Sequence, residues 1–171
     1  INNLLWKSNN HLSYNGLITS LEGNLKNLNY ESEKSALLKN DNTNIEIAPV
    51  LALKTSYPLK KESSKKNEIL SPTLMIRYAP LPMNNLENEQ LRLTTHNLFS
   101  LNKIDNTTVE NGTTLTIGAD YDYYDKNLGL NRFESSFGQV YSLSDNTNMP
   151  NQSSLHQKTS DLVGKIKYNF S

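Results

Sequence analysis

Residues 112–124, G-T-T-L-T-I-G-A-D-Y-D-Y-Y, alternate strictly between apolar and polar side chains from Thr113 onward. One set is Leu115, Ile117, Ala119, Tyr121 and Tyr123, and the other is Thr114, Thr116, Gly118, Asp120 and Asp122. Because successive side chains leave opposite faces of a pleated strand, this period of two predicts a β-strand. About twelve residues at roughly 3.3 Å each, tilted by about 40°, cover on the order of 30 Å, the apolar thickness of a membrane. The contrast between the two faces favours a wall between lipid and water.

The composition narrows the class of protein. The 171 residues include 17 basic and 17 acidic side chains, so a net charge of zero removes the general electrostatic argument for nucleic acid. The chain has no cysteine, which excludes disulfides and thiolate metal sites. A mean hydropathy of −0.62 suits a soluble protein, but a transmembrane barrel gives a similar average because half of its strand residues and its loops face water. The chain begins with Ile1 and shows no signal-peptide pattern, so we expect an internal fragment of a longer protein.

The same alternation recurs along the chain and predicts about seven or eight antiparallel strands without a helix. The predicted strands are 4–8, 16–30, 44–59, 68–79, 91–101 (weaker), 112–124, 132–143 and 161–170. Two irregularities are expected within them. A switch of face in 16–30 predicts a bulge near Gly23, and Pro49, which lacks a ladder donor, requires a bulge or an unpaired edge. Pro80 and Pro82 end their strand.

Strand length separates a membrane barrel from a soluble sandwich. Strands in soluble sheets usually have about 5–6 residues, whereas membrane-spanning strands have about 9–11 and carry aromatic girdles. Aromatic side chains lie near strand ends on the apolar face: Tyr57, Tyr78, Tyr121, Tyr123, Tyr141, Tyr168 and Phe170. We therefore predict an all-β fold, an antiparallel up-and-down transmembrane β-barrel segment, with residues 1–171 as a fragment of one barrel domain. In isolation such a segment is an open, curved sheet with unpaired end strands.

Short phrases between about residues 45 and 166 resemble, in the same order, the barrel of the LptD family of outer-membrane lipopolysaccharide-assembly proteins. They include S-Y-P-L at 56–59, R-Y-A-P at 77–80, N-L-F at 97–99, E-N-G-T at 110–113, F-G-Q-V-Y at 137–141 and S-D-L-V-G at 160–164. The signature residues are Pro58, Pro72, Tyr78, Pro80, Asn97, Leu98, Phe99, Glu110, Gly112, Gly118, Gly138, Gln139, Tyr141, Ser160, Asp161 and Gly164. The chain departs from the family pattern at 90–91, at 105–108 and at Thr114, where the family often has arginine.

The resemblance implies a large barrel that receives lipopolysaccharide from a periplasmic bridge of Lpt proteins and releases it into the outer leaflet. It also implies an LptE-like lipoprotein plug inside the barrel, surrounding outer-membrane lipid, no cofactor, no enzymatic activity and location in the outer membrane of a Gram-negative bacterium. This chain would be an inner part of the wall, without the periplasmic jelly roll and the gate strands. The alternatives are an outer-membrane porin or channel and, from another class, a soluble all-β binding module.

Four cations on the polar strand faces, Lys54, Arg77, Lys165 and Lys167, are candidate lumen-facing contacts for an anionic glycolipid. The lysine-rich residues 60–67 could hold lipid phosphates or form a solvated hairpin turn. The loops 60–67, 102–111 and 144–159 are expected at one end of the barrel, and the loops 31–44, 80–90 and 126–131 at the other. The long Asn/Ser loop 144–159 indicates that the first end is extracellular.

Other chemistry is weakly supported by the residues. Asp120, Asp122 and Asp125 form D-x-D-x-x-D, but no calcium-loop glycine or bidentate glutamate follows, so a water-facing wall is the favoured interpretation. The three histidines, His11, His96 and His156, lie in separate polar stretches, so no metal site is predicted. No nucleophile elbow supports a hydrolase.

Overall fold

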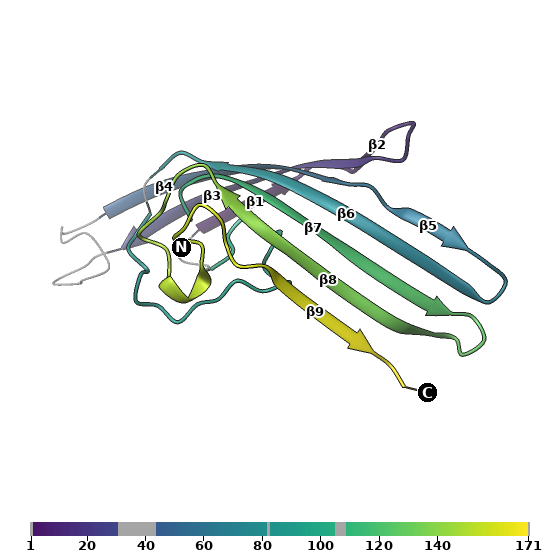
Figure 1. The fold of residues 1–171 in the computed structure, drawn as a ribbon. Helices are drawn as coiled ribbons and strands as arrows, with labels where there is room; N and C mark the ends of the chain where they lie inside the picture. Colours follow the sequence, from purple (N-terminus) through teal and green to yellow (C-terminus); the bar gives the residue numbers. More distant parts are fainter. Residues whose placement is uncertain (1, 31–43, 82, 105–108, 171) are drawn as a thin grey trace.

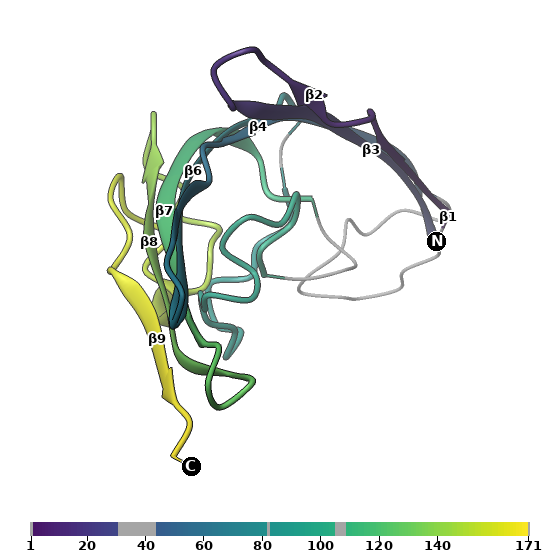
Figure 2. The same cartoon turned by 90° about the vertical axis from the view of Figure 1, so that its right-hand side faces the viewer.

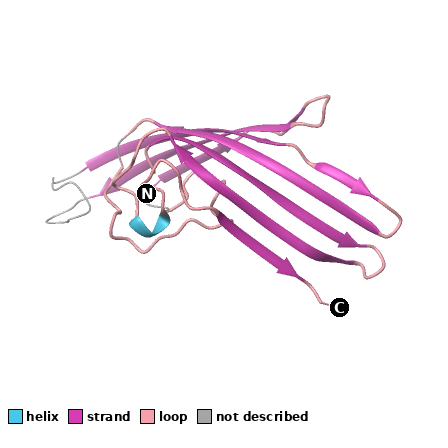
Figure 3. Cartoon of the chain, viewed as in Figure 1, coloured by secondary structure: helices cyan, strands magenta, loops and turns pink. Residues whose placement is uncertain are grey.

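The computed structural model describes residues 2–30, 44–81, 83–104 and 109–170, and these form one antiparallel sheet that curves around an open concave side (Figures 1 and 2). Its strand order is β1-β3-β4-β6-β7-β8-β9, with the short β2 beside β3 and β5 beside β6. The strands are β1 (Asn2–Lys7), β2 (His11–Leu12), β3 (Ile18–Tyr30), β4 (Asn44–Ser56), β5 (Leu59–Glu62), β6 (Lys66–Ala79), β7 (Gly112–Asp125), β8 (Leu130–Ser142) and β9 (Val163–Tyr168). A single 3-10 turn, Asn151–Ser153, interrupts the loops of the described part of the chain (Figure 3).

This architecture confirms the predicted fold class. The strands β6 and β7 have 14 residues each and pair without interruption from Lys66↔Asp125 to Ala79↔Gly112. The sheet is open, since β1 and β9 each pair with one neighbour in the described residues. A search of the described residues finds no helix with the length and apolarity needed to cross a membrane.

The two faces of the sheet differ as the alternation predicts. On the convex outer face, large apolar side chains are exposed, among them Leu74, Ile76, Ile117 and Phe137. On the concave inner face their sequence neighbours are buried, and loops cover them (Figure 2). The apolar side chains of the outer face therefore pack against no second layer within the described part of the chain.

The predicted strand 91–101 is wrong. The described residues between β6 and β7 contain no strand, and these two strands pair directly with each other. Asn97 holds the segment in a compact turn: its amide nitrogen donates to the carbonyls of Arg92 and Lys103, and its amide oxygen accepts from the Thr94 N–H. Such side-chain bonds to local backbone replace ladder bonds and favour a loop.

The predicted bulge near Gly23 is also wrong. Gly23 pairs in an unbroken register with Trp6 on one side and Leu51 on the other. A Cβ at this position would lie 3.4 Å from Leu51 Cδ2 and 3.7 Å from Trp6 Cε3, which are ordinary van der Waals distances, so the continuous strand does not require a glycine here. The expectation for Pro49 is confirmed, because the β4–β6 ladder begins only at Leu51.

The predicted grouping of the loops requires correction. Without a strand at 91–101 the chain crosses the sheet one time fewer, so residues 80–111 and 143–162 leave the sheet at one end (Figure 1). The short turns 63–65 and 126–129 lie at the opposite end, which separates the lysine-rich turn from the long Asn/Ser loop. The turn is also shorter than predicted, since β5 and β6 include most of residues 60–67. Of the predicted loop 31–44, residues 31–43 lie outside the described residues.

Candidate functional site

Two loops lie on the inner face of the sheet and pack against each other. We call residues 80–111 the first inner loop, of which residue 82 and residues 105–108 are not described, and residues 143–162 the second inner loop. The Leu86 N–H donates to the Asn148 carbonyl at 2.8 Å, and the Asn151 N–H donates to the Glu87 carbonyl at 3.2 Å. A buried apolar cluster joins both loops to β8 and contains Met83, Leu86, Leu93, Leu98, Val140, Met149 and Leu155. Removal of this apolar surface from water, worth about 25 cal/mol per Å², stabilises the loops on the wall.

A recess made by two glycines receives the first inner loop. Gly118 and Gly138 pair directly across β7 and β8. A Cβ added to Gly138 would lie 2.5 Å from Leu98 Cδ2, and one added to Gly118 would lie 3.1 Å from Phe99 Cζ. Leu98 and Phe99 therefore approach the strands more closely than a side chain at either glycine would allow. Residues of the N-L-F phrase thus pack against two glycines that are far from them in the sequence.

Arg77 and Glu110 bind the backbone of the first inner loop. The Arg77 side chain is buried, its Nε donates to the Leu101 carbonyl, and its Nη2 donates to the Glu110 carbonyl at 2.5 Å. The Glu110 carboxylate accepts from the backbone N–H groups of Lys103 and, at 2.8 Å, Ile104. Buried backbone groups in an irregular loop have no ladder partner, so charged side chains satisfy them here.

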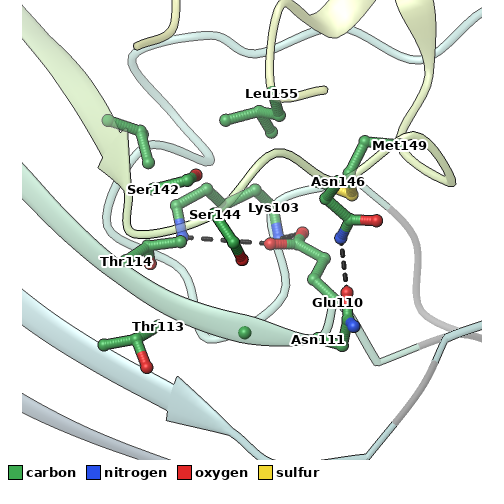
Figure 4. A pocket seen from close by; sticks show the side chains of 12 residues that line it. Lys103, Glu110, Asn111, Thr113, Thr114, Ser142, Ser144, Asn146, Met149 and Leu155 are labelled. Atoms are coloured by element: carbon green, nitrogen blue, oxygen red, sulfur yellow. Dashed lines mark hydrogen bonds and ion pairs between the residues drawn. The ribbon is translucent and has the colours of Figure 1, made fainter. Parts of the chain in front are cut away.

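A buried lysine completes this anchor. The Lys103 ammonium lies 3.9 Å from Glu110 Oε2, and its side chain is 1% exposed. Burial lowers the pKa of Lys103 to about 8; the Glu110 carboxylate opposes this shift and the Arg77 cation adds to it. Figure 4 shows Lys103 and Glu110 beside a small cavity between β7 and the second inner loop, where the Asn146 amide donates to Asn111 Oδ1 at 2.5 Å.

The end of the second inner loop is held to β8 by other signature residues. Ser160 Oγ accepts from the Val140 N–H at 3.0 Å, and Gln139 Nε2 donates to the Ser160 carbonyl at 2.6 Å. The Tyr141 hydroxyl in turn donates to Gln139 Oε1 at 2.8 Å. Strand β9 pairs with β8 only up to Gly138, which leaves the last residues of β8 without a strand partner. The end of the second inner loop bonds to these residues instead.

The four predicted lumen cations have different environments. Lys165 and Lys167 are exposed on the inner face of β9, where Lys167 lies 3.3 Å from the Glu134 carboxylate. Lys54 is half-buried, and its ammonium lies 5.2 Å from the Phe99 ring centroid. Arg77 shares the inner face but lies beneath the first inner loop, so its guanidinium contacts protein oxygens and is not exposed to the lumen.

The structure does not bring the candidate metal ligands or the lysines of residues 60–67 together into a site. Asp120 and Asp122 follow the inner face of β7, while Asp125 ends the strand and accepts from the Asn127 N–H at 2.9 Å. The histidines belong to β2 and to the two inner loops, and the described residues contain no group of three or more potential metal ligands. Beside the lysine-rich turn, ion pairs join Lys60 of β5 and Lys126 of the turn 126–129 to Glu62.

Sequence reasoning did not identify the buried role of Lys103. A lysine in a polar loop is usually solvated, and the residues that surround this one come from β6, β7 and the second inner loop. The one available signal was its position between two signature phrases, N-L-F and E-N-G-T, whose side chains bind the same loop.

Long antiparallel strands with an exposed apolar outer face, and with an inner face that carries ordered loops, are consistent with a segment of a β-barrel. A model of one protein family, LptD, described as LPS transport system D, matches residues 13–171. The chain therefore belongs to the LptD family, as the signature residues predicted, and this outer-membrane family acts in lipopolysaccharide transport and assembly through the Lpt system. A search of curated proteins finds no match to the chain.

Proposed function

We propose that this chain is an inner part of the barrel wall of an LptD-type protein that delivers lipopolysaccharide to the outer leaflet of a Gram-negative outer membrane. Residues 1–171 would belong to one barrel domain. The observation that carries the proposal is the division of the sheet into an exposed apolar outer face and an inner face that is partly covered by loops and elsewhere exposes charged side chains, among them Asp120, Lys165 and Lys167. A wall of this kind suits hydrocarbon outside and a hydrated path inside.

The proposed role is passive and includes no covalent step. Several signature residues pack or bind backbone where the loops meet the wall, among them Leu98, Gly138, Glu110 and Ser160, and none of these is placed as a nucleophile beside a base. The wall supplies a lipid-matched exterior and a polar interior, while the energy for transport comes from outside this membrane. The free edges of β1 and β9 support continuation of the sheet by further strands.

The partners follow from the same proposal. Lipopolysaccharide would pass along the inner face, an LptE-like lipoprotein would occupy the lumen, and the periplasmic Lpt bridge would dock on another domain of the complete protein. Lys54, Lys165 and Lys167 are the proposed lumen contacts for the anionic glycolipid. Lys165 and Lys167 are exposed, and an exposed ion pair such as Lys167–Glu134 contributes only about 0–1 kcal/mol, so it leaves the ammonium available.

Depletion of the complete protein in cells tests the general function. Newly made lipopolysaccharide should disappear from the cell surface while synthesis continues. A porin or channel barrel predicts the opposite result, with surface lipopolysaccharide unchanged and the uptake of small solutes reduced.

Charge reversal tests the proposed contacts. The double variant Lys165→Glu and Lys167→Glu in the complete protein should slow lipopolysaccharide export while the folded barrel remains at its normal level. The matched control is Lys65→Glu, which changes an exposed lysine in the turn 63–65. Normal export by an intact double variant would contradict the assignment of these two lysines without contradicting the function of the barrel.

A further inference from the structure

A small cavity separates the inner wall from the two inner loops. Its volume is about 20 Å³, which is enough for one particle of the size of a water molecule or a small ion. Figure 4 shows side chains from three parts of the chain around it. They include Lys103 from the first inner loop, Thr114 from β7, and Ser144 and Asn146 from the second inner loop.

The charges beside the cavity do not balance. The Lys103 ammonium makes no hydrogen bond within the described part of the chain, and its 3.9 Å separation from Glu110 is longer than a hydrogen bond. The buried Arg77 guanidinium donates to the Glu110 main-chain carbonyl, and among the described residues Glu110 is the one carboxylate that acts electrostatically on both buried cations. The described residues therefore leave one positive charge in excess, and because an uncompensated buried charge is costly, this excess favours a bound anion.

The hydrogen-bonding groups around the cavity include an ammonium, which can only donate, and hydroxyls, which can donate or accept. The ammonium has three N–H groups, and the buried Thr114 hydroxyl has no partner among the described residues. The hydroxyls of Ser142 and Ser144 also line the cavity. The Glu110 carboxylate already accepts from two backbone N–H groups. A ligand that accepts hydrogen bonds and carries a negative charge therefore matches the Lys103 ammonium, and the Thr114 hydroxyl can donate to it.

We propose that the cavity binds one small monovalent anion of about the size of chloride, held by the Lys103 ammonium and the Thr114 hydroxyl. The anion would neutralise the excess charge and connect the first inner loop to β7. The volume excludes a lipid phosphate or sulfate. A water molecule would satisfy the hydrogen bonds but not the charge. The proposal concerns the stability of the loops and does not depend on which substrate the barrel carries.

Bromide provides a direct test because it replaces chloride and can be located by anomalous scattering. Crystals of the complete protein soaked in sodium bromide should show an anomalous peak within about 3.5 Å of Lys103 Nζ. The peak should be absent in Lys103→Met and reduced in the milder variant Thr114→Val. A well-ordered site that contains water and no bromide would overturn the proposal.

Thermal unfolding gives an independent measurement on the complete protein in detergent. At constant ionic strength, replacement of gluconate by chloride should raise the Tm saturably, by about 2 °C or more, because a ligand of the folded state stabilises it. The rise should be lost in Lys103→Met and reduced in Thr114→Val. The control Lys165→Met removes an exposed lysine from the same face and should keep the rise. An equal response in all four proteins would contradict the site.

Discussion

In β6 and β7, residues that are adjacent in the sequence differ sharply in solvent exposure, because they point to opposite faces of the sheet. Ile76 is 46% exposed, whereas Met75, one position before it, is 0% exposed. The same alternation places Ile117 outside and Thr116 beneath the loops. In a water-soluble protein, exposed isoleucines in such a row would be unfavourable. Burial of inner-face side chains therefore depends on the loops, while the row of exposed apolar side chains on the outer face suits an apolar solvent.

Five of the signature residues follow this difference, whereas Tyr78 and Tyr141 lie on the outer face. Gly118, Gly138, Glu110, Leu98 and Ser160 all meet at the inner face, where they join the loops to the wall. The outer face needs only apolar character, and many sequences satisfy that need. The inner face needs particular side chains, because each contact there fits one partner.

The largest expected effect comes from a charge placed on the outer face. Ile117→Arg should destabilise the barrel by about 2–4 kcal/mol, because a cation near the centre of the bilayer loses its hydration. Heat-modifiable electrophoresis of the complete protein should show less folded barrel. Asp120→Arg, on the opposite face of β7, is the matched control and should fold at a near-normal level. Equal loss in both variants would contradict the assignment of the faces.

A smaller effect is expected where the inner face receives the first inner loop. Gly138→Ala should cost about 1–3 kcal/mol, because its Cβ would overlap Leu98 Cδ2 and the Ile117 carbonyl. Limited proteolysis should cleave the first inner loop faster than in the wild type. Gly164→Ala is the control, since the nearest heavy atom lies 3.6 Å from its Cβ. Unchanged cleavage in Gly138→Ala would show that the loop does not need the recess.

Loss of one negative charge should have a further effect on the same loop. Glu110→Gln keeps the size of the side chain but weakens its charge-assisted bonds to the Lys103 and Ile104 N–H groups, at a cost of about 1–2 kcal/mol. Hydrogen exchange should become faster at these two amides. Glu134→Gln, which removes an exposed ion pair, should change stability by less than about 1 kcal/mol. Equal protection in both variants would argue against the anchor.

The sequence predicts the outer face well because its signal is local. A period of two over a long strand assigns each side chain to a face, whatever its neighbours are, and the assignment of Ile117, Phe137 and Tyr141 to one face is confirmed. Pro49 and Pro80 also act locally, through a missing ladder donor. The order of the signature phrases identified the family for the same reason, since it can be read along the chain.

The inner site could not be predicted because its contacts are distant in sequence. Leu91 and Leu93 alternate with polar residues as in a strand, but Leu93 is buried by Val140 and by the second inner loop. The wrong strand at 91–101 then reversed the ends assigned to several loops. Lys103 resembles any solvated lysine until Arg77, Glu110 and Thr114 are placed around it.

The smallest expected effect is a pH dependence confined to the inner site. The folded-state pKa of Lys103 is about 8, below the ordinary value of 10.5, so between these values the unfolded chain binds more protons than the folded one. Stability should therefore rise with pH. The free-energy cost of burying the charged Lys103 ammonium is fully present below pH 8 and disappears as the pH approaches 10.5.

Between pH 7 and pH 9 the wild type should gain about 1 kcal/mol relative to Lys103→Met, measured as the difference between their unfolding free energies in chloride-free gluconate. Chloride should reduce this gain, because an anion beside the ammonium favours its protonated form and raises its pKa. Ile117→Arg changes the outer face and should leave the slope intact in whatever barrel folds. A stability difference that does not change with pH in gluconate would mean that protein groups already compensate the Lys103 charge. The inner face would then differ from the outer face only in how specifically its side chains pack.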